Sequence, residues 1–145
     1  MVLSVIFFSW SILSSLLIYK YLGVSLGKQS GYSYSKLVEF FLVVIFAPII
    51  ETILFQYLPI NQVFISYNGK NKKLVAVLIS ALCFGVIHLY SLYYFFVMSI
   101  GGLLLAYYFC SFKQKTNSIS AIFYIALIHS LSNFYIFLIK TLEIL

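Results

Sequence analysis

Residues 47–56 read Ala-Pro-Ile-Ile-Glu-Thr-Ile-Leu-Phe-Gln, and they place one carboxylate, that of Glu51, inside an otherwise apolar run. The flanking residues are also apolar or aromatic, with VVIF at 43–46 and YL at 57–58. A charged side chain at membrane depth costs about 2.5 kcal/mol or more, so an intramembrane Glu is a functional candidate by default. Pro48 removes a backbone hydrogen bond and frees the carbonyl four residues back, that of Val44. The stretch therefore predicts a kinked membrane helix with a cavity beside Glu51.

The composition of the chain excludes a water-soluble fold. Its 145 residues are 63% hydrophobic and only 8% charged, with a mean hydropathy of +1.08, whereas soluble domains carry about 25% charged residues. The net charge of +6 comes from lysines that lie mostly between the apolar runs, as expected of side chains that face lipid headgroups. A nucleic-acid partner is excluded because there is no basic stripe and the aromatic residues lie inside apolar segments. The lipid bilayer is the expected partner.

The spacing of the apolar runs predicts an all-α, polytopic membrane bundle. The run over 74–110 would form a helix of about 55 Å at 1.5 Å per residue, too long for one crossing, so we divide it at Tyr90-Ser91. About five transmembrane helices follow, at 2–19, 37–58, 74–89, 92–110 and 119–139, with loops at 20–36, 59–73 and 111–118. We expect 1–36 to form an N-terminal transmembrane helix and loop, and 37–145 to form a four-helix catalytic core. Ser99, Gly101 and Gly102 give the fourth helix a face suited to close helix contact.

The other strong polar groups in the apolar runs come in pairs at helical spacing. His88 follows Phe84 by four residues, and Asn133 follows His129 by four, so each pair shares one helix face. If these faces turn toward Glu51, the core holds a carboxylate, two imidazoles and an amide. A carboxylate can act as general base on water, assisted by an imidazole. Imidazole and amide groups can also donate hydrogen bonds to a developing oxyanion. This set suits hydrolysis of an acyl bond.

Each of these residues also has a simpler interpretation. Glu51 can pair with a lysine that reaches in from a helix end, His88 can lie at the membrane interface, and Asn133 can link two helices. A carboxylate and two histidines can also bind zinc, although the spacing matches no zinc motif. The predicted helix ends place Glu51 and His88 at different depths in the membrane, which argues against a shared site.

Three short stretches resemble motifs of the CPBP (Abi) family, which contains type II CAAX prenyl endopeptidases and bacteriocin-processing or bacteriocin-immunity proteins. The stretches are APIIE at 47–51, FGVIH at 84–88 and HSLSN at 129–133, and they are similar to the family motifs EExxxR, FxxxH and HxxxN in that order. The resemblance covers about residues 37–140. It implies an intramembrane glutamic endopeptidase in which Glu51 and His88 activate water, while His129 and Asn133 stabilise the oxyanion. It also implies that no cofactor is needed, with zinc as the less favoured alternative.

The sequence departs from the first motif at two positions. Thr52 stands where the family has its second Glu, and Gln56 stands where the family has Arg. Positions 52 and 56 are one turn apart on a helix, so the two changes together indicate the loss of an ion pair. We expect a neutral, hydrogen-bonded Thr–Gln pair in its place. We therefore treat Thr52, Gln56 and Phe84 as supporting residues around Glu51.

The sequence predicts an intramembrane endopeptidase that hydrolyses a peptide bond of a membrane-associated or peptide substrate. The expected substrates are CAAX-like prenylated proteins or peptides in bacteriocin or signal-peptide maturation, in a multi-pass protein of the bacterial cell membrane. The alternative is a catalytically silent relative that acts in bacteriocin self-immunity or peptide binding. A small transporter or channel component is a third class.

Overall fold

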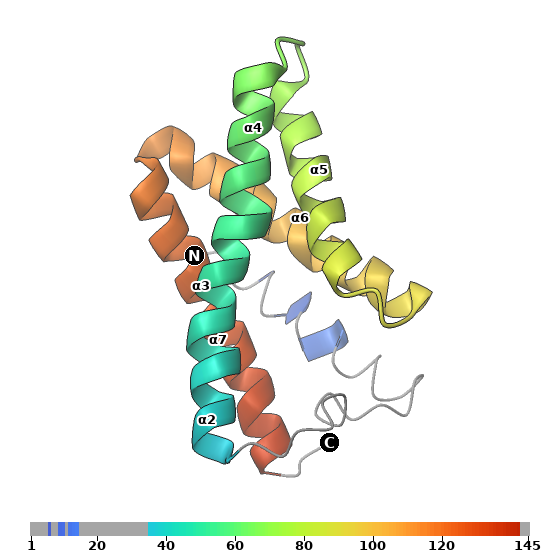
Figure 1. The fold of residues 1–145 in the computed structure, drawn as a ribbon, viewed down its shortest axis with the longest axis vertical. Helices are drawn as coiled ribbons and strands as arrows, with labels where there is room; N and C mark the ends of the chain where they lie inside the picture. Colours follow the sequence, from blue (N-terminus) through green and yellow to red (C-terminus); the bar gives the residue numbers. More distant parts are fainter. Residues whose placement is uncertain (1–5, 7–8, 11, 15–34, 143–145) are drawn as a thin grey trace.

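The computed structural model describes residues 6, 9, 10, 12–14 and 35–142. From residue 35 onward its elements are α2 (Lys36–Phe40), η1 (Phe41–Phe46), α3 (Ala47–Glu51), η2 (Thr52–Tyr57), α4 (Leu58–Ser66), α5 (Lys72–Ile87), α6 (Leu92–Lys115) and α7 (Ser118–Thr141). All of these are helices, arranged as a bundle in Figure 1. Within the described residues, three helices are long and apolar enough to cross a membrane, namely Lys36–Ser66, Leu92–Lys115 and Ser118–Thr141. The prediction of an all-α membrane helix bundle is confirmed.

The first five elements follow one another without a break and form one helix over Lys36–Ser66, called the long helix below. The predicted end at residue 58 is therefore wrong, because the helix continues through Pro59 to Ser66. The loop predicted at 59–73 is confirmed only over 67–71, since α5 starts at Lys72. Six-residue π-helical stretches, η1 and η2, end just before Pro48 and Pro59 respectively. A proline ring clashes with the carbonyl four residues back in an α-helix. The wider π turn moves that carbonyl away, so each proline is accommodated without ending the helix.

The length of α5 explains how residues predicted at different depths come together. This helix has 16 residues and contacts α4 and η2, so it packs beside only the C-terminal half of the long helix (Figure 1). His88, which directly follows α5, therefore lies level with the middle of the long helix, not at its far end. The sequence placed Glu51 and His88 at different depths because it predicted that the long helix ends at residue 58, whereas this helix continues to Ser66. Because α5 is shorter than the three spanning helices, the third predicted crossing is not among them, and the first predicted run lies mostly outside the described residues.

Close contact between α5 and α6 depends on two glycines. A Cβ atom on Gly85 would lie 2.0 Å from the Ser99 hydroxyl oxygen, and one on Gly102 would lie 2.8 Å from the Cβ of Phe84. The predicted small-residue face of the fourth helix is thus confirmed at Ser99 and Gly102, since only a missing side chain lets the helices approach this closely. The predicted break between these helices is also confirmed, because α5 ends at Ile87 and α6 starts at Leu92.

The last helix, α7, covers the half of the long helix that α5 leaves free. It contacts η1, α3 and η2, and it also packs on α6. Asn117 caps its start, because the Asn117 side chain accepts a hydrogen bond of 2.8 Å from the Ser120 N–H. The polar loop predicted at 111–118 is shorter than expected, since α6 continues to Lys115 and α7 already begins at Ser118. The long helix, α5, α6 and α7 thus surround one interior.

Candidate active site

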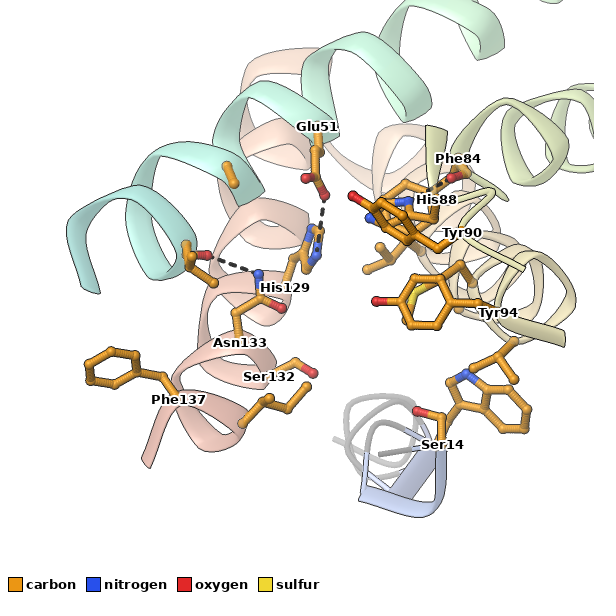
Figure 2. A pocket seen from close by; sticks show the side chains of 18 of the residues that line it. Ser14, Glu51, Phe84, His88, Tyr90, Tyr94, His129, Ser132, Asn133 and Phe137 are labelled. Atoms are coloured by element: carbon orange, nitrogen blue, oxygen red, sulfur yellow. Dashed lines mark hydrogen bonds and ion pairs between the residues drawn. The ribbon is translucent and has the colours of Figure 1, made fainter. Parts of the chain in front are cut away.

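One cavity of about 370 Å³ lies in this interior, and all four predicted site residues line it. Glu51 comes from the long helix, His88 from the end of α5, and His129 and Asn133 from α7 (Figure 2). Phe84 lines the same cavity. Three stretches separated by dozens of residues are thus brought to one place, as the shared chemistry of their side chains predicted.

Glu51 and His129 form the closest pair among the site residues. The His129 Nε2 and Glu51 Oε2 atoms are 3.7 Å apart, as the dashed line in Figure 2 marks. His129 is buried, with 6% of its surface exposed, and its Nδ1 has no hydrogen-bond partner in the described part of the chain. The sequence paired Glu51 with His88, but the imidazole nearest to Glu51 is that of His129. A proton can pass between these two side chains after a small movement.

His88 is oriented by the end of its own helix. Its backbone N–H donates to the Gly85 carbonyl at 3.0 Å, so the Phe84 carbonyl loses its usual α-helical donor. The His88 Nδ1 lies 2.8 Å from that carbonyl and must donate to it, because a carbonyl oxygen only accepts. The other ring nitrogen, Nε2, then carries a lone pair. The FxxxH spacing thus yields an imidazole whose Nε2 is fixed as an acceptor.

The ring of Phe84 packs against both histidines. Its centroid is 4.7 Å from that of His88 and 5.8 Å from that of His129. Phe84 is only 4% exposed, and it lies directly against Gly102. An apolar ring held in this position restricts the direction of both imidazoles. This contact gives the aromatic residue of the motif a physical role.

Asn133 is bound to the backbone of the long helix. Its Nδ2 donates to the Val43 carbonyl at 2.9 Å. Within η1 the Ala47 N–H donates to Leu42, five residues back, and in that register the donor for Val43 would be Pro48, which has no N–H. The carbonyl freed by Pro48 is therefore that of Val43. Our prediction of Val44 assumed α-helical spacing and is wrong by one residue.

The two positions that depart from the family motif lie outside the cavity. Thr52 and Gln56 are both 0% exposed, and neither lines the cavity. The predicted hydrogen bond between them is absent, because the Thr52 hydroxyl and both amide atoms of Gln56 have no partner among the described residues. The π register of η2 alters the spacing on which that prediction depended. Both side chains point into packed protein, whereas the adjacent Glu51 faces the cavity.

A comparison with protein-family models finds a match over residues 33–135, to the family described as type II CAAX prenyl endopeptidase Rce1-like. The chain belongs to this family. The match includes all three motifs, the long helix, α5 and α6, and it ends at residue 135 within α7. No curated protein and no solved structure matches the chain. Family membership and the three apolar helices identify an integral membrane protein of a CAAX-type endopeptidase family.

The Rce1-like cavity contains residues that sequence reasoning did not select. They are Trp10, Ser14, Glu39, Tyr90, Tyr94, Ser132 and Lys140, together with apolar side chains of α6 and α7. At one end Lys140 donates to Glu39 and forms an ion pair between α7 and α2. Ser132 had a detectable signal, because it follows His129 by three residues on the same helix. Tyr90 and Tyr94 had no such signal in the sequence. Tyr90 lies in the connection between α5 and α6, Tyr94 lies in the first turn of α6, and the sequence does not give the geometry of this connection.

The structure also shows how the side chains that could bind a metal ion are placed. In the stretches that the structure describes, no group of three or more His, Cys, Asp and Glu side chains is placed to hold a metal ion. Glu51 and His129 approach each other, while His88 is held against the Phe84 carbonyl on α5. The Glu51–His129 pair alone would supply two of the four ligands that zinc usually takes.

Proposed function

We propose that this Rce1-like protein is an intramembrane endopeptidase that hydrolyses a peptide bond with a water activated by Glu51. The observation that supports this proposal is the meeting of Glu51, His88, His129 and Asn133 at one cavity. Residues 37–145 would form the catalytic core, and 1–36 an accessory N-terminal segment. The cavity is lined by apolar and aromatic residues beside a few polar groups, which suits a peptide with a lipid or apolar side chain.

The proposed reaction follows from the positions of the polar atoms. The attacking water gives a proton to the Glu51 carboxylate while the His88 Nε2 accepts a hydrogen bond from its other O–H. The water oxygen bonds to the carbonyl carbon, and the carbonyl oxygen becomes an oxyanion. His129 lies close to Glu51 and stabilises the protonated Glu51 carboxyl. When the His129 imidazole itself carries the proton, it donates a hydrogen bond to the oxyanion. The C–N bond then breaks, and the proton on Glu51 moves to the leaving nitrogen.

The role proposed for Glu51 is tested by Glu51→Gln, which keeps the shape but removes the base. The purified protein in liposomes is given two probes, a farnesylated CAAX-type peptide and a peptide with a double-glycine leader, and products are measured by mass spectrometry. We expect cleavage of at least one probe, and loss of it by 10³-fold or more in Glu51→Gln. Glu143→Gln makes the same chemical change near the end of the chain and should cleave normally. Cleavage of either probe by Glu51→Gln at the wild-type rate would remove Glu51 as the base.

Chelation separates the proposed mechanism from the zinc alternative. Exhaustive dialysis against a chelator should leave the rate unchanged if Glu51 acts directly on water. A loss of activity that added Zn²⁺ restores would instead assign Glu51 and His129 to a metal site.

The second candidate is a protein that binds a peptide without cleaving it, as in bacteriocin self-immunity. The hydrogen bond that holds Asn133 to the Val43 carbonyl favours it, because this contact occupies a side chain expected to serve the oxyanion. On this alternative neither probe is cleaved, and Glu51→Gln leaves peptide binding and any immunity phenotype unchanged.

A further inference from the structure

Tyr94 occupies a defined position in the first turn of α6. Ser91 precedes this helix, and its hydroxyl oxygen accepts a hydrogen bond of 3.1 Å from the Tyr94 N–H. A side-chain cap of this kind fixes the first turn of a helix relative to the preceding chain. Only the residues between α5 and α6 separate this turn from His88. The cap therefore fixes the position of Tyr94 relative to His88.

The ring of Tyr94 is held on two sides, and its hydroxyl faces the cavity. The ring centroid lies 6.2 Å from that of His88 and 5.4 Å from that of Tyr90. Figure 2 shows the Tyr94 hydroxyl pointing across the cavity, toward the side from which Glu51 and His129 project. A rigid phenol with its O–H directed at the place of reaction is a pre-organised hydrogen-bond donor.

The other expected donors are partly engaged elsewhere. Asn133 uses one amide hydrogen on the Val43 carbonyl. His129 faces Glu51 through Nε2, and its Nδ1 is buried away from the cavity surface. The His88 Nδ1 donates to the Phe84 carbonyl, which leaves its Nε2 as an acceptor. These contacts leave fewer free donors on the α7 side, and Tyr94 offers an additional donor from the α6 side.

We propose that Tyr94 is a catalytic residue whose phenolic O–H donates a hydrogen bond to the oxyanion of the tetrahedral intermediate. This inference rests on the proposed endopeptidase function. As the water oxygen bonds to the carbonyl carbon, the carbonyl π electrons move to the carbonyl oxygen, and the Tyr94 O–H binds that oxygen without giving up its proton. The interaction weakens again when the carbonyl re-forms and the C–N bond breaks. The phenol thus stabilises the transition state more than the bound substrate.

Tyr90 lines the same cavity but does not fit this role equally well. Tyr90 is 63% exposed, whereas Tyr94 is half-buried between two rings. A donor that is shielded from solvent contributes more to stabilising a charge than one that solvent reaches. The lower exposure therefore favours Tyr94 over Tyr90, which lies in the turn before α6.

The test uses Tyr94→Phe, which removes the hydroxyl and keeps the ring. With the probe peptide that the wild type cleaves, we expect kcat to fall by about 10²–10³-fold, the usual effect of losing one oxyanion donor, with KM changed less than threefold. Tyr93→Phe is the matched control on α6, because Tyr93 does not line the cavity, and it should keep the wild-type kcat. Thermal unfolding in detergent should be the same for both variants.

A binding measurement makes the test independent of turnover. A phosphinic analogue of the probe peptide carries a tetrahedral anionic centre, and its affinity is measured in the Glu51→Gln background. We expect Tyr94→Phe to weaken this affinity at least tenfold and to leave affinity for the uncleaved probe unchanged. Equal affinity with and without the hydroxyl would overturn the role of Tyr94. That result is distinct from failure of the proposed function, which is judged by the effect of Glu51→Gln alone on cleavage.

Discussion

Glu51 and Thr52 are adjacent in the chain but lie in different environments. Glu51 faces the cavity with His129 nearby, whereas Thr52 and Gln56 lie in packed protein with no polar partner in the described part of the chain. The long helix thus has a cavity face, formed by Val43, Ala47 and Glu51, and a packed face, formed by Thr52 and Gln56. The difference shows that a motif of consecutive polar residues does not imply one shared site. Changes of charge on the packed face should therefore affect stability first.

Thr52→Glu should have the largest effect on stability. It places a carboxylate where no surface is exposed, and an unpaired buried charge costs about 3–5 kcal/mol. We expect a large loss of accumulation and of thermal stability in detergent. Adding Gln56→Arg supplies a partner one turn away and should recover most of the loss. If the two changes are simply additive, positions 52 and 56 do not share the packed face.

Gly102→Ala tests the close approach of α6 to Phe84, the residue that packs against both histidines. The new Cβ would lie 2.8 Å from the Phe84 Cβ, which forces α5 and α6 apart and should destabilise the protein by about 1–3 kcal/mol. Gly101→Ala is the control, because among the described residues the atom nearest to its Cβ would be the Trp10 Nε1 at 3.7 Å, an ordinary contact. The free energy of unfolding in a mixed detergent titration measures both. Equal effects of the two substitutions would contradict the close approach at Phe84.

Gln56→Leu should stabilise the protein by about 1 kcal/mol, because it removes a buried amide that makes no hydrogen bond with any described residue. The control is Gln62→Leu, where the amide is exposed and donates to Ser66, so its removal should change stability little. Thermal unfolding of both variants measures the difference. A loss of stability in Gln56→Leu alone would show that the buried Gln56 amide has a hydrogen-bond partner inside the protein.

The ion pair at the end of the cavity should have the smallest effect. The Lys140 and Glu39 side chains are 35% and 29% exposed, and partly exposed pairs contribute about 0–1 kcal/mol. A double-mutant cycle with Glu39→Gln and Lys140→Met should give a coupling energy in that range, which falls as salt is added. A larger coupling that resists salt would show that this end of the cavity excludes water.

Several features followed from the sequence alone. Apolar runs separated by lysines require a bundle of membrane helices, because a chain this short can keep so much apolar surface away from water only in a bilayer. The rarity of polar groups in those runs selected Glu51, His88, His129 and Asn133, since burying such groups without a role is costly. The break at Tyr90-Ser91 followed from the length that one crossing allows.

The tertiary structure alone decided how these residues meet. Local rules treated Pro59 as a helix end, but two π-helical stretches carry the long helix through both prolines, and α5 therefore ends beside Glu51. Which imidazole faces Glu51, which carbonyl holds Asn133 and which face buries Thr52 and Gln56 all depend on helix register. A shift of one residue turns a side chain by about 100° around an α-helix, and packing between helices sets that register. Tyr94 enters the site for the same reason, because its position depends on how α6 starts against α5.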